Sequence, residues 1–230
     1  MVLIILLPAL VVFLFSLYRL VKDDYIFIRK GISLEQSFDL AFIIFWISLF
    51  FSRLFFLLFH FIPKQNIFLA FFSLKNGGLS LTGAIMGGII ALYIFGRYKK
   101  LPLGRLSDFF SLSFLYALPV GLLVSAFFTN KNQLLYLFLN VIIYFVVLLF
   151  FVQFLYPKIL NRTLKEGILS ILFTLTFSTI SLLTSLLSSI KHIQLFLTTQ
   201  NAATLLLFFF SIFLLIKENA SSRSRRSLNR

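Results

Sequence analysis

The chain contains no cysteine, and its 230 residues include only two histidines and seven acidic side chains. Without cysteine it can form no disulfide, no thiolate nucleophile and no thiolate metal site. The two histidines, His60 and His192, are too few and too far apart in the sequence for a convincing metal cluster. We therefore expect neither a metal site nor a cofactor.

Apolar residues, by contrast, dominate the composition. They make up 60% of the chain against 12% charged residues, and the mean hydropathy is +1.02. Apolar stretches run well past eighteen residues, more than a soluble core could hide. The sequence predicts an all-α polytopic membrane protein with about seven transmembrane helices, because lipid offers backbone polar groups no partner and no barrel-like alternation occurs. The expected spans are residues 3–20, 38–62, 79–95, 106–128, 134–155, 168–190 and 196–216.

The net charge of +14 comes from lysines and arginines in the loops. Their number from one loop to the next and into the tail is four, two, four, one, three, one and five. Under the positive-inside rule this alternation predicts an outside N-terminus and a cytoplasmic C-terminus. The placement favours topology and anionic lipid over nucleic acid.

Domain organisation is expected to be simple. The first apolar stretch lacks a basic region before it and a clear cleavage site after it, so we expect a retained span rather than a signal peptide. All loops are short, which predicts one transmembrane domain over residues 1–217. Residues 218–230 are then a basic cytoplasmic tail, expected to be disordered.

Charges inside spans are costly in hydrocarbon and so are candidates for function. Arg53 lies deep in the second span, and two interpretations stay open: an anion or phosphate site, or a structural residue bonded to backbone carbonyls. Asp108 lies near the start of the fourth span. It is either an orienting or basic group or, the favoured interpretation, the N-terminal cap of its own helix.

Glycines crowd into one stretch, NGGLSLTGAIMGG, at residues 76–88. Gly77 and Gly78 precede the apolar run and suit a turn whose backbone amides could meet an anion. Four small residues follow at spacings that allow close helix approach, and packing is the favoured interpretation: Gly83, Ala84, Gly87 and Gly88. The sixth span is rich in serine and threonine, which favours a packing face over a polar conduit.

Order and spacing around these glycines resemble a known family. KNGGLSLTGAIMGG is similar to the stretch EGGMSFHGGLIGG of bacterial prolipoprotein diacylglyceryl transferases. In that family a basic loop and an SDF-like helix start follow, and the signature GRxGNF begins thirteen residues past the aspartate. Here Asp108 to Gly121 reproduces that interval, and Arg53 falls on the arginine of a family segment ending in GARLxYVLF.

The resemblance implies a seven-span enzyme of the bacterial plasma membrane that moves a diacylglyceryl group from phosphatidylglycerol to the cysteine of a prolipoprotein signal peptide. It also implies a histidine in the glycine motif, an arginine and asparagine in GRxGNF, and later charged residues. This chain has Thr82 at the histidine position, Leu122 at the arginine and Ser125 at the asparagine. No charged residue occurs between Gly167 and Ile190.

These departures set the functional hypotheses. We expect a family member that is impaired or repurposed, so whether it is an enzyme stays open. Its lipid-headgroup region is expected at the motif positions Gly77, Gly78, Thr82, Gly83, Gly121, Leu122 and Ser125. The alternative is a divergent but active transferase that uses Arg53 for phosphate, His60 as a base and Asp108. A second alternative is a small lipid-handling transporter or a membrane interaction subunit.

Overall fold

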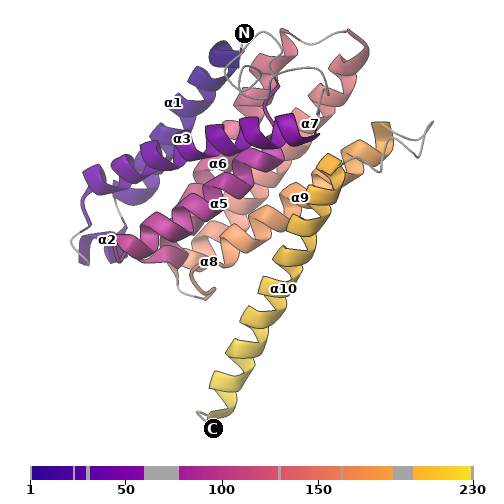
Figure 1. The fold of residues 1–230 in the computed structure, drawn as a ribbon. Coiled ribbons are helices and arrows are strands. Elements are labelled where there is room, and N and C mark those ends of the chain that lie inside the picture. The colour runs from indigo at the N-terminus through magenta and orange to yellow at the C-terminus, as the bar shows by residue number, and fades with distance from the viewer. Residues whose placement is uncertain are drawn as a thin grey trace.

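The computed structural model of the chain is built from helices in the part that it describes, residues 2–22, 24–29, 32–59, 78–128, 131–161, 163–188 and 199–228 (Figure 1). The elements are α1 (Val2–Lys22), α2 (Tyr25–Arg29), α3 (Leu34–Phe59), α5 (Leu81–Tyr98), α6 (Leu103–Ala126), α7 (Lys131–Phe150), the π-helix η1 (Phe151–Leu155), α8 (Tyr156–Leu160), α9 (Ile168–Ser188) and α10 (Thr199–Leu228).

Seven of these helical segments are long and apolar enough to cross a membrane, which confirms the predicted fold class. Helices α7, η1 and α8 run on without a break and supply one of the seven. Helix α10 continues through the expected tail to Leu228, so the boundary placed after residue 217 does not coincide with the end of a helix. The orientation of the termini stays a prediction.

Helix α6 lies at the centre of the bundle. It packs against α1, α7 and α9, while α3 pairs with α5 and α10 pairs with α9 (Figure 1). Half of the residues in its membrane-spanning stretch are buried, a larger share than in any other spanning helix of the described chain. Its apolar side chains, Leu106, Phe109 and Leu112 among them, form the middle of the hydrophobic core. Residues on α6 are therefore well placed to contact several helices at once.

The small residues of α5 allow α3 to approach closely. A Cβ atom on Gly83 would lie 2.6 Å from the Cβ of Phe55, and one on Gly87 would lie 2.5 Å from the Cβ of Phe51. Real Cβ atoms do not come that near, so this contact requires glycine at both positions. The packing role that the spacing predicted is confirmed.

The hydroxyl-rich helix α9 also packs as expected. Most of its threonines and serines donate to carbonyls of their own helix, as Ser178 does to Thr174 at 2.8 Å. Two contacts join α9 to α10: Ser211 donates to the Thr174 hydroxyl at 2.9 Å, and the Asn201 amide donates to the Ser185 hydroxyl at 2.6 Å. Hydrogen bonds of this kind hold helices together in lipid.

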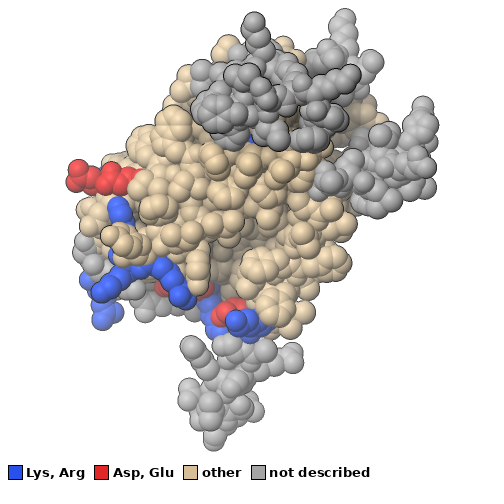
Figure 2. Space-filling view, viewed as in Figure 1, with Lys and Arg blue, Asp and Glu red and all other residues tan. Residues whose placement is uncertain are grey.

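Charged side chains gather at one end of the bundle, the lower end of Figure 2. The contacts of Arg105 with Asp24 and Ile159 bring the ends of α1 and α8 beside the start of α6. Exposed cations on or next to these segments and at the end of α5 are Lys22, Arg97, Lys99, Lys100 and Lys158. We call this the basic end. The band above it in that view is uncharged over most of its height. The positive-inside rule predicts that the basic end faces the cytoplasm.

Candidate functional site

Arg53 is buried near the C-terminal end of α3, far from the basic end. Its Nη1 donates to the carbonyl of Gly78 at 2.9 Å, and its guanidinium lies 5.7 Å from the centre of the Phe56 ring. Next to it, Ser52 donates its hydroxyl to the Ser80 carbonyl at 2.9 Å, and its own carbonyl accepts the Ser80 N–H at 3.1 Å. These bonds join α3 to the turn that begins α5.

The glycine motif continues from that turn. Ser80 is the N-cap of α5, and its hydroxyl accepts the N–H of Gly83 at 3.2 Å. Thr82, at the position of the family histidine, is 1% exposed. A Cβ atom on Gly78 would overlap the Phe56 ring. Gly77 lies outside the described residues, as does His60 further upstream.

Three more candidate residues lie on the last turns of α6. A Cβ atom on Gly121 would lie 3.5 Å from the Cβ of Ala9 in α1, an ordinary contact. Leu122 packs against the hydrophobic core. Ser125 donates its hydroxyl to the Leu122 carbonyl at 2.6 Å. Leu122 therefore places an apolar side chain where the family signature has an arginine.

Asp108 does not cap its own helix, so the favoured interpretation was wrong. Helix α6 begins at Leu103, which places Asp108 in its second turn. The carboxylate instead accepts the N–H groups of Gly167 at 2.7 Å and Ser170 at 3.0 Å, at the start of α9. Those amides have no partner within their own helix, and Asp108 supplies one from a neighbouring helix.

A buried ion pair lies beside Asp108, and the sequence analysis missed it. Arg105 donates to the carboxylate of Asp24 through Nη2 at 2.6 Å and Nε at 3.0 Å, and to the Ile159 carbonyl at 3.3 Å. Both charged side chains are almost fully buried. Arg105 was counted as a loop charge. The hint of a partner in the sequence was the pair of acidic residues, Asp23 and Asp24, in an otherwise basic loop.

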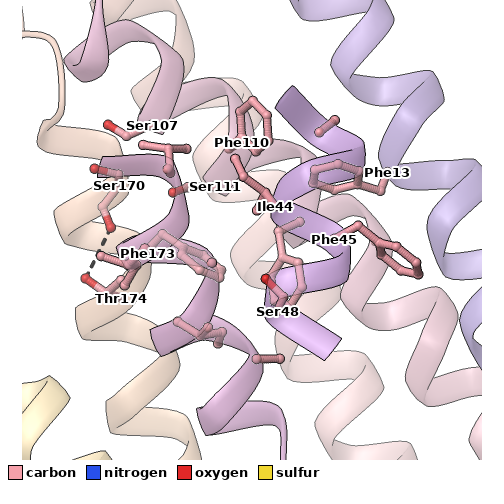
Figure 3. A pocket seen from close by; sticks show the side chains of 18 of the residues that line it. Phe13, Ile44, Phe45, Ser48, Ser107, Phe110, Ser111, Ser170, Phe173 and Thr174 are labelled. Atoms are coloured by element: carbon pink, nitrogen blue, oxygen red, sulfur yellow. Dashed lines mark hydrogen bonds between the residues drawn. The ribbon is translucent and has the colours of Figure 1, made fainter. Parts of the chain in front are cut away.

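A cavity of about 260 Å³ lies in the middle of the bundle (Figure 3). Helices α1, α3, α5, α6, α9 and α10 all contribute to its lining. The lining is mostly apolar, with Phe13, Ile44, Phe45, Phe110 and Phe173 among its larger side chains. No described residue that lines it is charged.

Hydroxyl groups are the polar side chains of the cavity. They come from four helices: Ser48 of α3, Ser107 and Ser111 of α6, Ser170 and Thr174 of α9, and Ser211 of α10. Figure 3 shows Ser48 and Ser111 projecting from facing helices. None of the described site residues predicted from the sequence, Arg53 and Asp108 included, lines the cavity. No three described His, Cys, Asp or Glu side chains lie together as metal ligands.

Comparison with protein families bears directly on this arrangement. A model of the prolipoprotein diacylglyceryl transferases matches residues 2–131, which is more than half of the chain and contains all of α1 to α6. The chain belongs to the prolipoprotein diacylglyceryl transferase family.

Curated relatives match the chain over shorter stretches. A phosphatidylglycerol–prolipoprotein diacylglyceryl transferase of Clostridium kluyveri is 30% identical over 92 residues, 40% of this chain and 36% of that protein. Another, of Corynebacterium glutamicum, is 40% identical over 65 residues, 28% of this chain and 19% of that protein. The aligned region thus spans about a third or less of the length of these relatives. No solved structure matches the chain.

Within the prolipoprotein diacylglyceryl transferase family, the matched region contains the three positions at which this chain departs from the family motifs, Thr82, Leu122 and Ser125. A threonine hydroxyl, as in Thr82, is no base near neutral pH, and Leu122 carries no charge. Helices α9 and α10 lie beyond the matched region, yet they supply half of the cavity's hydroxyl-bearing side chains. The chain is a multi-pass membrane protein of the transferase family with a polar but uncharged cavity.

Proposed function

We propose that this family member binds a membrane lipid in its central cavity and has lost the diacylglyceryl transfer reaction. It acts in the bacterial plasma membrane, where phospholipids that include phosphatidylglycerol surround it. A prolipoprotein signal peptide is a second partner, one that the protein either still binds or bound before it lost the reaction. The observation that carries the proposal is the cavity itself, which lies inside a membrane-spanning bundle and whose described lining has no charged residue.

Transfer chemistry needs charges that this cavity lacks. The incoming cysteine has to become a thiolate, which calls for a base, and the departing glycerol phosphate has to be stabilised by cations or hydrogen-bond donors. Removing one such donor typically costs about 2.7–4 kcal/mol in barrier, and several acting together are lost as a unit. Thr82 and Leu122 stand where two of these groups are expected.

The buried charges of the described chain have other partners. Arg105 bonds Asp24 and the Ile159 carbonyl, Asp108 bonds the start of α9, and Arg53 bonds the Gly78 carbonyl. Using any of them for catalysis would mean giving up a contact that joins helices. This supports lipid binding over a rearranged catalytic centre.

A cavity-filling variant tests the binding. Ala84 lines the cavity, so Ala84→Phe is expected to reduce the lipid that co-purifies with the protein, measured by mass spectrometry after extraction. Ala202 is exposed on α10, and Ala202→Phe is the matched control that should leave the lipid content unchanged. Equal lipid content in the two folded variants would contradict binding in the cavity.

The alternative, a divergent active enzyme, makes a different prediction. If Arg53 holds the phosphate, Arg53→Ala should abolish both phosphatidylglycerol binding and transfer to a cysteine peptide, whereas exposed Arg97→Ala should change neither. The proposal expects the lipid content of Arg53→Ala to match that of the parent protein. A selective loss of phosphatidylglycerol in that variant would favour the alternative.

A further inference from the structure

The hydrogen-bonding state of the cavity hydroxyls indicates what kind of lipid head they can accept. Ser107 donates to the Gly104 carbonyl and Ser170 to the Gly167 carbonyl, each at 2.8 Å. Thr174 donates within its own helix. The Ser211 hydroxyl lies 2.7 Å from the Leu207 carbonyl and 2.9 Å from the Thr174 hydroxyl, and its single proton is donated to one of these two oxygens. A hydroxyl that has already donated its proton can only accept a further hydrogen bond. Much of the polar lining therefore offers acceptors.

Two lining hydroxyls are in a different state. Those of Ser48 and Ser111 make no hydrogen bond with any described residue, and both face the cavity (Figure 3). A hydroxyl in an apolar environment is costly to leave without a partner. Ser48 also lies against α5, where a Cβ atom on Gly88 would come within 3.0 Å of its Oγ. Each of these hydroxyls can donate one hydrogen bond to a bound molecule and accept one from it.

The hydroxyls are also grouped along the bundle. Ser107 and Ser111 lie in the first three turns of α6, and Ser170 and Thr174 in the first two turns of α9, both near the basic end. Ser211 is bonded to Thr174 and so belongs to the same level. Towards the other end the lining is alkyl or aromatic, as at Leu6, Ala9 and Ile85, except for Ser48 in the middle of α3. The cavity thus has a polar half and an apolar half.

A phosphate would fit this polar half poorly. It carries negative charge and only accepts hydrogen bonds unless protonated, so it requires cations or several donors. The cavity instead has acceptors, two hydroxyls able to donate, and no described cation. A free alcohol group matches such a lining, because it can donate to an acceptor and accept from a donor.

We infer that the cavity selects an uncharged glyceride with a free hydroxyl, of the diacylglycerol class, over phosphatidylglycerol. The inference rests on the proposed lipid-binding function. The glyceryl head lies among the hydroxyls of Ser48, Ser111 and Thr174, and the first carbons of the acyl chains lie in the apolar half. At about 260 Å³ the cavity is just below the 300–1,000 Å³ usual for ligand pockets, so the rest of each chain extends between helices into the membrane.

Lipid exchange measures the selectivity directly. The purified chain in detergent micelles is titrated with short-chain diacylglycerol and with short-chain phosphatidylglycerol, and the bound lipid is read by native mass spectrometry. Tighter binding of the diacylglycerol is expected. The Ser48→Ala and Ser111→Ala variants should each weaken its binding roughly two- to tenfold, the range expected for one net hydrogen bond.

Ser113 provides the matched control. It lies on α6 two residues from Ser111, is fully buried, has a hydroxyl without a partner among the described residues, and does not line the cavity. Ser113→Ala should therefore leave diacylglycerol binding unchanged. An equal loss in Ser113→Ala and Ser111→Ala would overturn the assignment, because the effect would then come from helix packing.

The remaining outcomes separate the two proposals. If phosphatidylglycerol binds as tightly as diacylglycerol and Ala84→Phe removes both, the selectivity is wrong and lipid binding in the cavity stands. If neither lipid binds, or binding persists in Ala84→Phe, the cavity is not a lipid site and both proposals fail.

Discussion

The basic end and the central cavity differ in the kind of polar side chain that they contain. At the basic end, Asp24, Arg105 and Asp108 are nearly fully buried, and each charge meets a partner on another helix or loop. In the cavity, polar groups line an open space and none of those described is charged. Among the described residues, buried charge joins helices at the basic end and does not line the cavity. The described side chains that pair charges at the basic end are therefore not those that line the cavity.

The largest expected effect comes from breaking the buried ion pair. Arg105→Leu leaves the Asp24 carboxylate buried with its main partner gone, which typically costs about 3–5 kcal/mol. We expect that loss in the free energy of unfolding, measured by denaturant titration in mixed micelles. The double variant Asp24→Leu/Arg105→Leu should recover most of it, because no lone charge then remains. A double variant less stable than either single variant would show that the ion pair is not the cause.

Removing the carboxylate of Asp108 should have the next largest effect. Asp108→Ala leaves two α9 amides without their acceptor, which is expected to cost about 1–3 kcal/mol in the free energy of unfolding. Asp108→Asn keeps one acceptor oxygen and should lose less. Hydrogen exchange of the Gly167 and Ser170 amides reports the same change locally. Unaltered exchange in Asp108→Ala would contradict the capping contact.

Alanine substitutions at two glycines of the family motifs should change the free energy of unfolding in different directions. Gly83→Ala forces a methyl group against Phe55 and the Phe51 carbonyl and is expected to destabilise the bundle by about 1–3 kcal/mol. Gly121→Ala meets only an ordinary contact with Ala9 and should be neutral or stabilising by up to about 1 kcal/mol, since alanine favours helices. Unfolding titrations of both variants provide the comparison. Similar losses in both would refute the close-packing account of α5.

The smallest effect is expected at an exposed ion pair. Lys165 and Glu218 lie 2.8 Å apart, but their side chains are 34% and 38% exposed. Solvent weakens such pairs, so Lys165→Ala should change the free energy of unfolding by only about 0–1 kcal/mol. A loss as large as that of Arg105→Leu would mean that burial does not explain the difference in stability expected between the two ion pairs.

Hydropathy alone predicted the fold class and the rough position of every span, because membrane insertion depends on apolar length. A close helix approach at the small residues of α5 could also be predicted, since small side chains at helical spacing let two helix backbones come near each other. That the partner is α3 was not predicted. Charge alternation predicted an orientation that the helices by themselves do not decide.

The buried polar contacts could not be predicted in the same way. Arg105 and Asp24 are 81 residues apart in the sequence, and their pairing depends on how α6 packs beside α2. Asp108 was assigned to its own helix because the local pattern resembles a cap, whereas a start of α9 that lies 59 residues later uses it. The cavity hydroxyls come from four helices, so no single stretch of sequence reveals them.

The central claim is that the family fold persists here without the family reaction. It is tested most directly by incubating the purified chain in phosphatidylglycerol vesicles with a peptide that contains a prolipoprotein cysteine, beside the Clostridium kluyveri relative as a positive control. Mass spectrometry of the peptide should show no diacylglyceryl thioether with this chain and clear modification with the relative. A thioether product that requires this chain would contradict the account.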